Sequence, residues 1–387
     1  MSVRTVLFTP VDAWFFRDGR PYYQGEAGQT DVRSIFPPSA LTVIGAVRAA
    51  LARGQGWNGR GSWNADLQRD LGNGTGDLGS LRFHGPFLMH KERYLFPVPL
   101  HLRGHWDNDA DSQKKKWSHA TFLAPSETEM ESDLGSVKFP VPQSQIQPDR
   151  QLKEPTGLWV TTEGYNSILR GDDPDADAFV RSDDLWRIEP RVGLERDHEK
   201  HAAKEGMLYS PAYVRLRRDV KLVVTVEGIQ DDWKLPDLIP FGGESRLAHC
   251  EVNPGSLPLP DVPVDQIRKS ETFTVSLLSP LLLPTNESGR HSHPEPGNAL
   301  DGLGSSRIVS ACVGKPIRIG GWNSVHREPE PLLSYLPAGS TWFCEIARPD
   351  ALDSLLKMHG KTIGDRRPHG LGQIAIGAWP TNLGDTA

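Results

Sequence analysis

Histidines are the residues of this sequence that could most directly catalyse a reaction. His359 and His369 could act as general acid and general base in RNA cleavage, because imidazole exchanges protons near neutral pH. The chain has 13 histidines, however, so such pairs also arise by chance. His291 and His293 could share a metal ion, but they lack carboxylate or cysteine ligands at a diagnostic spacing. We therefore expect no catalytic residue and no bound metal.

Two glycine-containing segments match nucleotide-binding motifs only in part. Gly360-Lys361-Thr362 ends like a P-loop, but Leu355 stands where the first glycine belongs, and a helix is predicted where a strand should precede. Gly302-Leu303-Gly304 is followed by Arg307 at the position of the third glycine of a dinucleotide fingerprint. The sequence therefore predicts no nucleotide and no other cofactor.

A first cluster of cations and an aromatic residue joins a predicted strand end and turn to a predicted helix. It begins at Phe16, and Arg17, Arg20 and Arg48 would form a cationic ledge. Guanidinium groups there would bind phosphates, and the unpaired amides of the helix start would assist them. The alternative is a surface pair of Arg17 and Asp18 beside ordinary helix capping.

Two further clusters combine cations with glycine. Residues 241–246 form a glycine turn followed by an alternating Glu and Arg, for which a hairpin with a salt bridge is the alternative. Residues 366–372 bring cations into a glycine-rich segment at a strand start, where backbone without side chains can approach a sugar-phosphate chain closely, although a plain turn remains an alternative. The expected RNA contacts are Gly243, Arg246, Arg367, His369, Gly370 and Gly372.

Length and charge limit how these clusters could work. A chain of 387 residues exceeds the roughly 250–300 residues at which one core stops growing, so we expect two domains, at 1–190 and 191–387. The net charge of −6 lacks the basic balance of a free-standing nucleic-acid-binding domain. RNA contact must then be local, with the acidic remainder facing solvent or protein partners.

Hydropathy and cysteine usage favour the cytoplasm. No apolar run approaches the ~20 residues that cross a bilayer, and Asp12 interrupts the N-terminus where a signal peptide would stay apolar. Cys250, Cys312 and Cys344 are an odd and widely spaced set, which argues against a disulfide framework and a structural zinc site.

The elements that position these residues are short. Ser39 is the predicted N-cap of a helix that runs to about Gly54, and residues 351–358 are a second short helix. Residues 104–150 show no periodicity and are expected to form a long mobile insertion. The predicted strands are 4–16, 87–90 pairing with 94–98, 220–227, 272–283, 342–346 and 371–379.

The clusters occur in an order that resembles a known family. The chain is similar to subunit three of the Cmr complex, the type III-B CRISPR effector, within the RAMP superfamily. The residues that carry the resemblance are 16–21, 36–48, 191–194 with 206–209, 242–246, 314–316 with 320–322, and 370–377. Each motif is short, but together they span nearly the whole chain. Two features depart from the family: the terminal glycine loop carries His369 and lacks a fuller run of glycines, and 104–150 matches nothing in it.

The resemblance implies an α+β fold of two ferredoxin-like (RRM-like) domains with long loop insertions. It implies a non-catalytic ribonucleoprotein subunit of antiviral defence that binds the 5′ handle of CRISPR RNA, with Trp322 among the RNA contacts. The partners would be the large polymerase-like subunit and the backbone subunits of the Cmr complex, with target RNA contacted indirectly and no membrane.

Two other functions remain open on the sequence. One is a metal-independent CRISPR RNA-processing endoribonuclease of the same superfamily that uses His359 or His369. The other is a carbohydrate-binding β protein, prompted by 11 tryptophans that are scattered along the chain rather than clustered.

Overall fold

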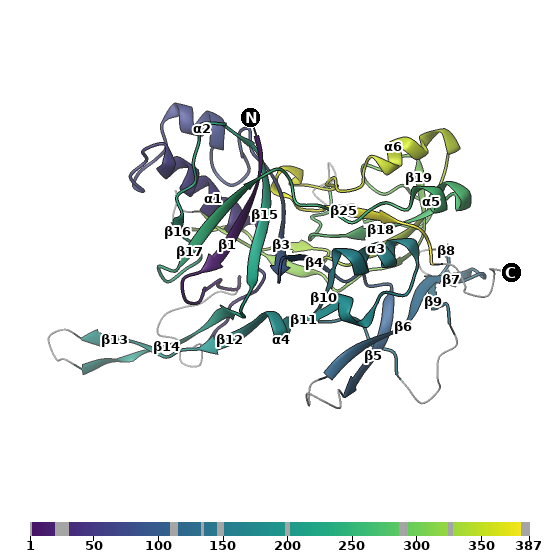
Figure 1. Ribbon diagram of the computed structural model, residues 1–387, viewed down its shortest axis with the longest axis horizontal. Coiled ribbons are helices and arrows are strands. Elements are labelled where there is room, and N and C mark those ends of the chain that lie inside the picture. The colour runs from purple at the N-terminus through teal and green to yellow at the C-terminus, as the bar shows by residue number, and fades with distance from the viewer. Residues whose placement is uncertain are drawn as a thin grey trace. The chain divides into compact units, whose positions relative to one another are not determined.

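The computed structural model describes residues 2–19, 31–108, 115–132, 135–144, 151–197, 202–285, 291, 293–323 and 328–380 as a strand-rich mixed α/β fold (Figure 1). The chain forms two compact units, and each is assembled from three separate stretches. Unit 1 comprises Met1–Glu92, Asp183–Leu257 and Arg318–Leu333, and unit 2 comprises Arg93–Ser182, Pro258–Ile317 and Ser334–Ala387. The units are therefore not the two successive halves expected from the sequence.

Unit 1 is built on an antiparallel sheet with the strand order β3, β15, β1, β17, β16. Val6 of the central strand pairs with Val224 on one side and Val252 on the other, and is fully buried. The strand expected over 4–16 ends at Pro10, beyond which Trp14 makes only an isolated bridge to Val214. The strands are β1 (Ser2–Pro10), β3 (Arg82–His90), β15 (Val220–Ile229), β16 (Leu238–Pro240) and β17 (Leu247–Pro254).

Helix α1 (Ala40–Gly54) of unit 1 begins where the sequence predicted it. The Ser39 Oγ accepts a hydrogen bond from the Thr42 N–H at 3.4 Å, which satisfies one of the unpaired amides of the first turn. The buried face of the helix carries Val43, Ile44, Val47 and Leu51. A short helix α2 (Ala65–Leu71) follows, capped by Asn64.

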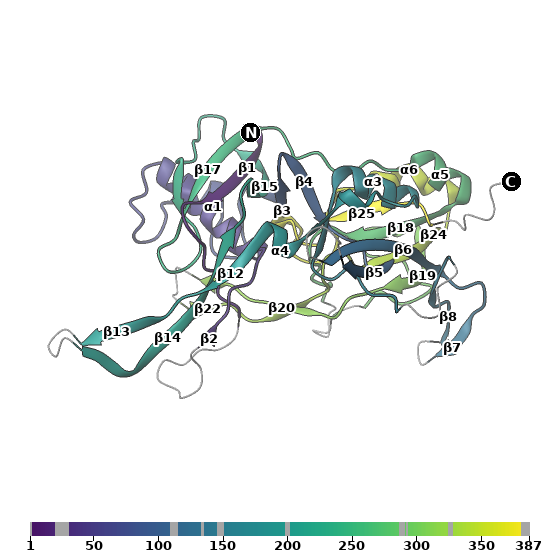
Figure 2. The same ribbon diagram turned by 60° about the horizontal axis from the view of Figure 1, so that its bottom comes forward.

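A narrow ribbon of strands projects from the sheet of unit 1 and is called the arm here (Figures 1 and 2). It consists of β12 (Trp186–Pro190), β13 (Gly193–Asp197) and β14 (Ala202–Leu216), with β12 and β13 both antiparallel to β14. The short strands β2 (Asp31–Val32), β21 (Trp322–Asn323) and β22 (Glu328–Pro329) complete unit 1; β2 pairs with β14, and β21 with β22.

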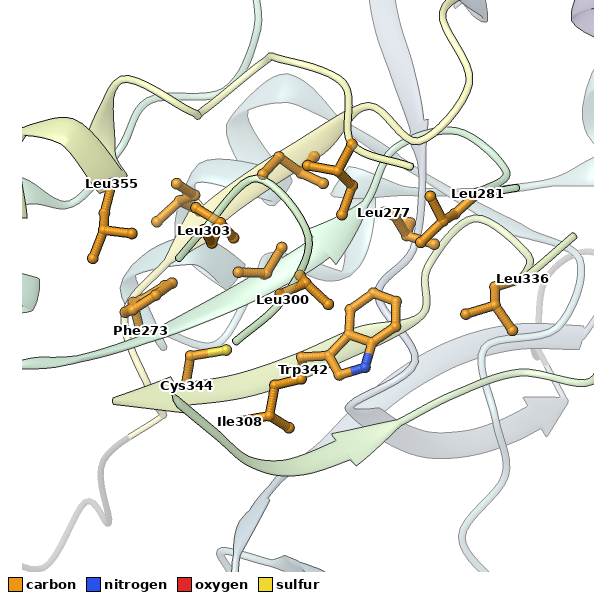
Figure 3. Packing of buried hydrophobic residues seen from close by; sticks show 14 of the residues in the cluster. Phe273, Leu277, Leu281, Leu300, Leu303, Ile308, Leu336, Trp342, Cys344 and Leu355 are labelled. Carbon is orange, nitrogen blue, oxygen red and sulfur yellow. The ribbon is translucent and has the colours of Figure 1, made fainter. Parts of the chain in front are cut away.

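Unit 2 contains a four-stranded antiparallel sheet in the order β19, β24, β18, β25. Figure 3 shows its core, where Trp342 and Phe273 of the sheet lie beside Leu300 and Leu303. The strand predicted at 342–346 is confirmed and begins one residue earlier, and those predicted at 272–283 and 371–379 are confirmed with shorter bounds. The elements are β18 (Thr272–Leu277), β19 (Ser306–Cys312), β24 (Thr341–Ile346), β25 (Ile374–Gly377), α5 (Val264–Ser270) and α6 (Leu352–Leu356).

The remaining elements of unit 2 correct the expectation for residues 104–150, whose described parts largely form strands. Trp106 and Trp117 face each other in an antiparallel pair and pack edge to face at 5.2 Å, so aromatic burial stabilises a segment that looked polar throughout. The elements are β4 (Arg93–Pro97), β5 (Leu102–Asn108), β6 (Lys115–Pro125), β7 (Met130–Ser132), β8 (Gly135–Val137), β9 (Pro140–Pro142), β10 (Leu158–Thr161), α3 (Thr162–Arg170) and β11 (Phe179–Arg181).

Three elements, α4 (Ser182–Leu185), β20 (Ile317–Ile319) and β23 (Leu333–Tyr335), lie where the chain passes from one unit to the other. In the part of the chain that the structure describes, no helix has the length and apolar character that crossing a bilayer requires.

Candidate nucleic-acid interface

The turn that carries Arg17 is held at its base by backbone contacts. Arg17 forms an antiparallel bridge with Ser34, and the Asp18 N–H donates to the Arg33 carbonyl at 3.0 Å. The backbone of Arg17 and Asp18 therefore lies beside that of Arg33 and Ser34. Arg20, the second cation of the cationic ledge, lies outside the described residues.

Arg48, the third cation of the expected cationic ledge, does not face solvent. Only 7% of the residue is exposed, and its guanidinium donates to the carbonyls of Leu71 at 2.7 Å, Gly72 at 2.8 Å and Gly74 at 2.6 Å. Burial lowers the pKa of Arg48 to about 10. The placement of Arg48 on an exposed ledge was wrong, because the unpaired carbonyls of the loop after α2 supply the polar partners that a buried cation needs.

Phe16 also lies inside the protein. It is 5% exposed and packs against Phe241 at 5.4 Å between ring centroids, and against Phe36 at 6.3 Å. A base therefore cannot stack on this ring, and its expected RNA contact is corrected to a core contact. Gly243 is exposed nearby, and its N–H donates to the Phe15 carbonyl at 2.8 Å.

Arg246 joins an ion-pair network at the root of the arm, which we call the arm-base network. Arg215 donates to both carboxylate oxygens of Glu189 and, through Nη2, to Asp12 at 2.8 Å. Arg191 donates to Glu189 at 2.6 Å and to Asp12 at 3.0 Å. Arg246 lies 3.6 Å from Asp12. The full network is Asp12, Arg187, Glu189, Arg191, Arg215 and Arg246.

Tyr213 forms the floor of the arm-base network. The guanidinium carbons of Arg191 and Arg246 lie 4.8 and 4.3 Å from the centroid of its ring, within cation–π range. Phe15 packs on the same ring at 5.6 Å. The tyrosine is only 5% exposed, so it holds the arginines in place without itself offering a free aromatic face.

The charges of the arm-base network reinforce one another. Hydrogen bonds from Arg215 and then Arg191 lower the pKa of Glu189 to about 2. Hydrogen bonds from Arg191 and Arg215 likewise hold the pKa of Asp12 below its usual value, and those from Glu189 and Asp12 raise the pKa of Arg215. Both carboxylates therefore stay ionised at neutral pH, and the network sets four guanidinium groups against these two carboxylates.

Sequence reasoning missed most of this network. Arg191 appeared only inside a family segment, and Tyr213, Arg215, Asp12 and Glu189 were not singled out. The strand register places Arg215 opposite Arg187 and Tyr213 opposite Glu189, but neither of these two strands was predicted from the sequence. Asp12 comes from a distant part of the sequence, so no local signal could have found it.

Trp322 is the predicted site residue that the structure exposes most clearly. It lies on β21, is 59% exposed, and its strand pairs with Pro329. The segment that carries it also approaches the Arg17 turn, because a Cβ added to Gly19 would lie 2.3 Å from Leu332. Gly320, two residues before Trp322, approaches the same leucine, so two clusters far apart in sequence meet at Leu332 in unit 1.

The predicted site residues of unit 2 occupy less accessible positions. Arg367 is partly exposed and pairs with Asp301 at 2.8 Å. His369 is buried, and Gly370 accepts a hydrogen bond from the Ser279 hydroxyl at 2.7 Å. These contacts are within the protein, which corrects the expectation that His369 and Gly370 lie open to RNA.

Gly372 needs its missing side chain for a contact within unit 2. Its φ of +71° is in the left-handed region, and an added Cβ would lie 2.2 Å from the Ile363 carbonyl oxygen. The close approach predicted at this glycine exists, but the approaching backbone is the protein's own. Gly372 is itself buried, which corrects the expectation that it lies open to RNA.

His359 and His369, the candidate acid–base pair, lie in the interior of unit 2. The Nδ1 of His359 accepts a hydrogen bond from the Ile376 N–H at 3.1 Å, and burial lowers the pKa of this imidazole. His369 is 2% exposed. His291 donates from Nδ1 to the Leu283 carbonyl at 3.0 Å. Across the described ranges, no group of three or more His, Cys, Asp or Glu side chains is arranged to hold a metal ion.

Comparison with protein families gives one extended match. A family model described as "CRISPR-associated protein (Cas_Cmr3)" matches residues 6–379. A curated relative, the "CRISPR system CMR subunit Cmr3" of Saccharolobus solfataricus, is 30% identical over 193 residues, which are 49% of this chain and 53% of the relative. The matched region thus spans about half the length of that relative.

Solved structures give weaker likenesses. A type III-B Cmr-beta complex bound to cognate target RNA and AMPPnP contains a chain that matches at a TM-score of 0.47 and 17% identity, with 88% of this chain and 86% of that chain covered. A Csm3–Csm4 subcomplex of the type III-A interference complex matches at a TM-score of 0.35 and 11% identity, with 89% and 94% covered.

Proposed function

Because the chain belongs to the Cmr3 family of CRISPR-associated proteins, we propose that it is a non-catalytic, RNA-binding subunit of a type III-B effector complex. Its ligand is the 5′ handle of CRISPR RNA, and its protein partners are the large polymerase-like subunit and the backbone subunits. Target RNA is contacted only through the complex. The net charge of −6 fits a protein whose acidic surface faces partners or solvent while RNA contact stays local.

One observation carries the RNA-binding proposal: the Arg17 turn lies against the segment that bears exposed Trp322. Single-stranded RNA is held by cations that track phosphates and by aromatic rings on which bases stack. The Arg17 turn supplies a cation and the Trp322 segment an exposed ring, and the two segments meet at Leu332. Arg367 belongs to unit 2, and its convergence with the Arg17 turn on the RNA stays a prediction.

Strand order supports two ferredoxin-like domains. That fold has the chain order β-α-β-β-α-β, with its first and third strands at the centre of the sheet. Unit 1 follows this order as β1, α1, β3, β15 and β17, with β1 and β15 central. Unit 2 follows it as β18, β19, β24, α6 and β25, with β18 and β24 central.

Each unit departs from the ferredoxin-like pattern by one helix. Between β15 and β17 of unit 1 the chain forms only β16 and loops. Between β18 and β19 of unit 2 the described residues contain no helix, and Leu300 and Leu303 from this crossover cover the sheet instead.

RNA binding should separate into a charge contribution and a stacking contribution. Arg17→Ala should flatten the log–log salt dependence of handle binding by about 0.7 if it removes one phosphate contact. Trp322→Ala should weaken binding by about 1–3 kcal/mol with an unchanged slope, because stacking releases no counterions. Fluorescence anisotropy of labelled handle RNA across a salt series measures both.

The matched control for Arg17→Ala is Arg69→Ala, because Arg69 is an exposed cation of the same unit that is not among the expected RNA contacts. It should leave the slope unchanged. Wild-type affinity and slope in both Arg17→Ala and Trp322→Ala would place the handle elsewhere.

The chain should not cut RNA. His359 and His369 are engaged in or buried by the fold of unit 2, so neither imidazole is presented to an external phosphodiester. Purified protein incubated with repeat RNA in EDTA should leave the RNA intact. Cleavage at one specific position, lost in His359→Gln or His369→Gln, would instead support the metal-independent endoribonuclease.

A further inference from the structure

The root of the arm holds more cations than the RNA contacts proposed above use. We propose that the arm-base network is a second RNA-binding site, at which phosphodiester groups replace the carboxylates of Asp12 and Glu189 as partners of Arg191, Arg215 and Arg246. The proposal rests on the proposed function, since the ligand is the same single-stranded RNA. It adds a site and a binding mode, an exchange of internal carboxylates for external phosphates.

The arginines already have the geometry that a phosphate requires. Arg215 meets both oxygens of Glu189 with Nε and Nη2, the two-pronged arrangement that guanidinium groups also make with phosphate oxygens. Arg191 and Arg215 converge on opposite oxygens of Asp12, at 3.0 and 2.8 Å. A phosphodiester that takes the place of either carboxylate would find donors in position, with little side-chain ordering left to complete.

The network also has donor capacity and charge in excess of its own acceptors. Four guanidinium groups face two carboxylates, so the cluster attracts anions while both carboxylates are in place. The Nη1 of Arg246 lies 3.6 Å from Asp12, beyond hydrogen-bond distance, so this guanidinium makes no hydrogen bond to either carboxylate among the contacts described. An incoming phosphate oxygen would therefore gain contacts that the carboxylates do not make.

The arm-base network is accessible to a ligand, although its arginines already pair with carboxylates of the protein. The arginine side chains of the network are 25–55% exposed, and those of Asp12 and Glu189 are 44% and 25% exposed. Tyr213 beneath them is nearly covered, so bases have no ring to stack on there. Contact is with the RNA backbone, which makes it dependent on salt and independent of base sequence.

The competing explanation is that these ion pairs only brace the arm, since an isolated two-stranded ribbon is marginally stable in water. The two explanations predict opposite effects when a carboxylate is neutralised. If the ion pairs only stabilise the arm, neutralising a carboxylate should destabilise the protein and leave its affinity for RNA unchanged. If the network exchanges carboxylates for phosphates, neutralising a carboxylate should raise the affinity for RNA, because the phosphate no longer has to displace a charged carboxylate.

Asp12→Asn tests this difference, and Asp66→Asn is its matched control. Both replacements keep the side-chain shape and remove one negative charge from a carboxylate paired with an arginine of unit 1. The full chain is titrated with labelled single-stranded handle RNA, and with a scrambled RNA of equal length, at low salt. Asp12→Asn should tighten binding of both RNAs by up to about fivefold, the worth of an exposed ion pair of about 1 kcal/mol. Asp66→Asn should change it much less.

A second pair of variants removes cations instead. Arg215→Gln should flatten the salt dependence by about 0.7, while Arg69→Gln should not. Thermal unfolding checks that each variant is folded. If Arg215→Gln does not fold, the RNA affinity of Asp12→Asn alone tests the proposal.

Weaker or unchanged binding by Asp12→Asn, with wild-type protein binding handle RNA normally, would overturn the exchange site and leave the proposed function standing. The same holds if the variants alter association with the large subunit but not with RNA, since the network would then bind protein carboxylates. Absence of handle binding by the wild-type chain would overturn both.

Discussion

Replacing Gly372 with alanine should destabilise unit 2 by about 3 kcal/mol or more, although only one methyl group is added. The left-handed φ of +71° costs about 1–2 kcal/mol for a residue with a side chain. The added Cβ would also lie 2.2 Å from the Ile363 carbonyl oxygen, and such overpacking typically costs a further 1–3 kcal/mol. Urea denaturation followed by tryptophan fluorescence reports the loss, since Trp342 lies in the core of this unit.

Gly304→Ala is the matched control in the same unit. Its Cβ would meet nothing within 4 Å, and its backbone is not left-handed. The substitution should change the free energy of unfolding by less than about 1 kcal/mol and could raise it by restricting the unfolded chain. Equal stability of the two variants, with weaker RNA binding only in Gly372→Ala, would instead indicate that Gly372 contacts RNA.

Arg48→Ala should be the second strongly destabilising change, by about 3 kcal/mol. It removes charge-assisted hydrogen bonds to three carbonyls and leaves those of Leu71 and Gly72 buried without a donor. Arg48→Met, which keeps much of the side-chain volume, should recover little, because the loss lies in the donors. Chemical denaturation measures the free energy of unfolding of both variants.

Arg53→Ala is the control on the same helix. Arg53, like Arg48, packs its guanidinium on a tryptophan ring of the loop between α1 and α2, Trp57 at 5.3 Å, but Arg53 itself is less buried than Arg48. Removing this cation–π contact should lower the free energy of unfolding by under about 1 kcal/mol. If Arg48→Ala were no less stable than Arg53→Ala and instead flattened the salt dependence of RNA binding, Arg48 would belong to the cationic ledge after all.

Local signals in the sequence were reliable where one residue type suffices to explain a structure. Ser39 predicted the start of α1, because a side-chain oxygen at this position satisfies helix amides whatever the rest of the fold does. The alternation of residues 220–227 predicted β15 for a similar reason. In the described part of 104–150, by contrast, strands form through cross-strand aromatic contacts, which have no period along the chain.

The candidate site was predictable as a list of residues but not as a surface. Phe16, Arg48 and His369 have the chemistry that RNA binding uses, yet all three are buried. Burial depends on partners distant in sequence, such as Phe241 for Phe16, and composition carries no information about such partners. Trp322 was both expected and found to be exposed, because the described residues provide only the short strand β22 as a pairing partner for its strand.

The sequence by itself determined the family, through the order of short motifs along the chain, and the secondary structure that depends on neighbouring residues. Only the tertiary structure decided which cations are structural and which are accessible. Arg48 and Arg215 look alike in the sequence, but buried carbonyls surround Arg48, and exposed carboxylates from distant segments surround Arg215. A guanidinium bonds to whichever acceptors the folded chain brings to it, so its role follows from contacts that form only on folding.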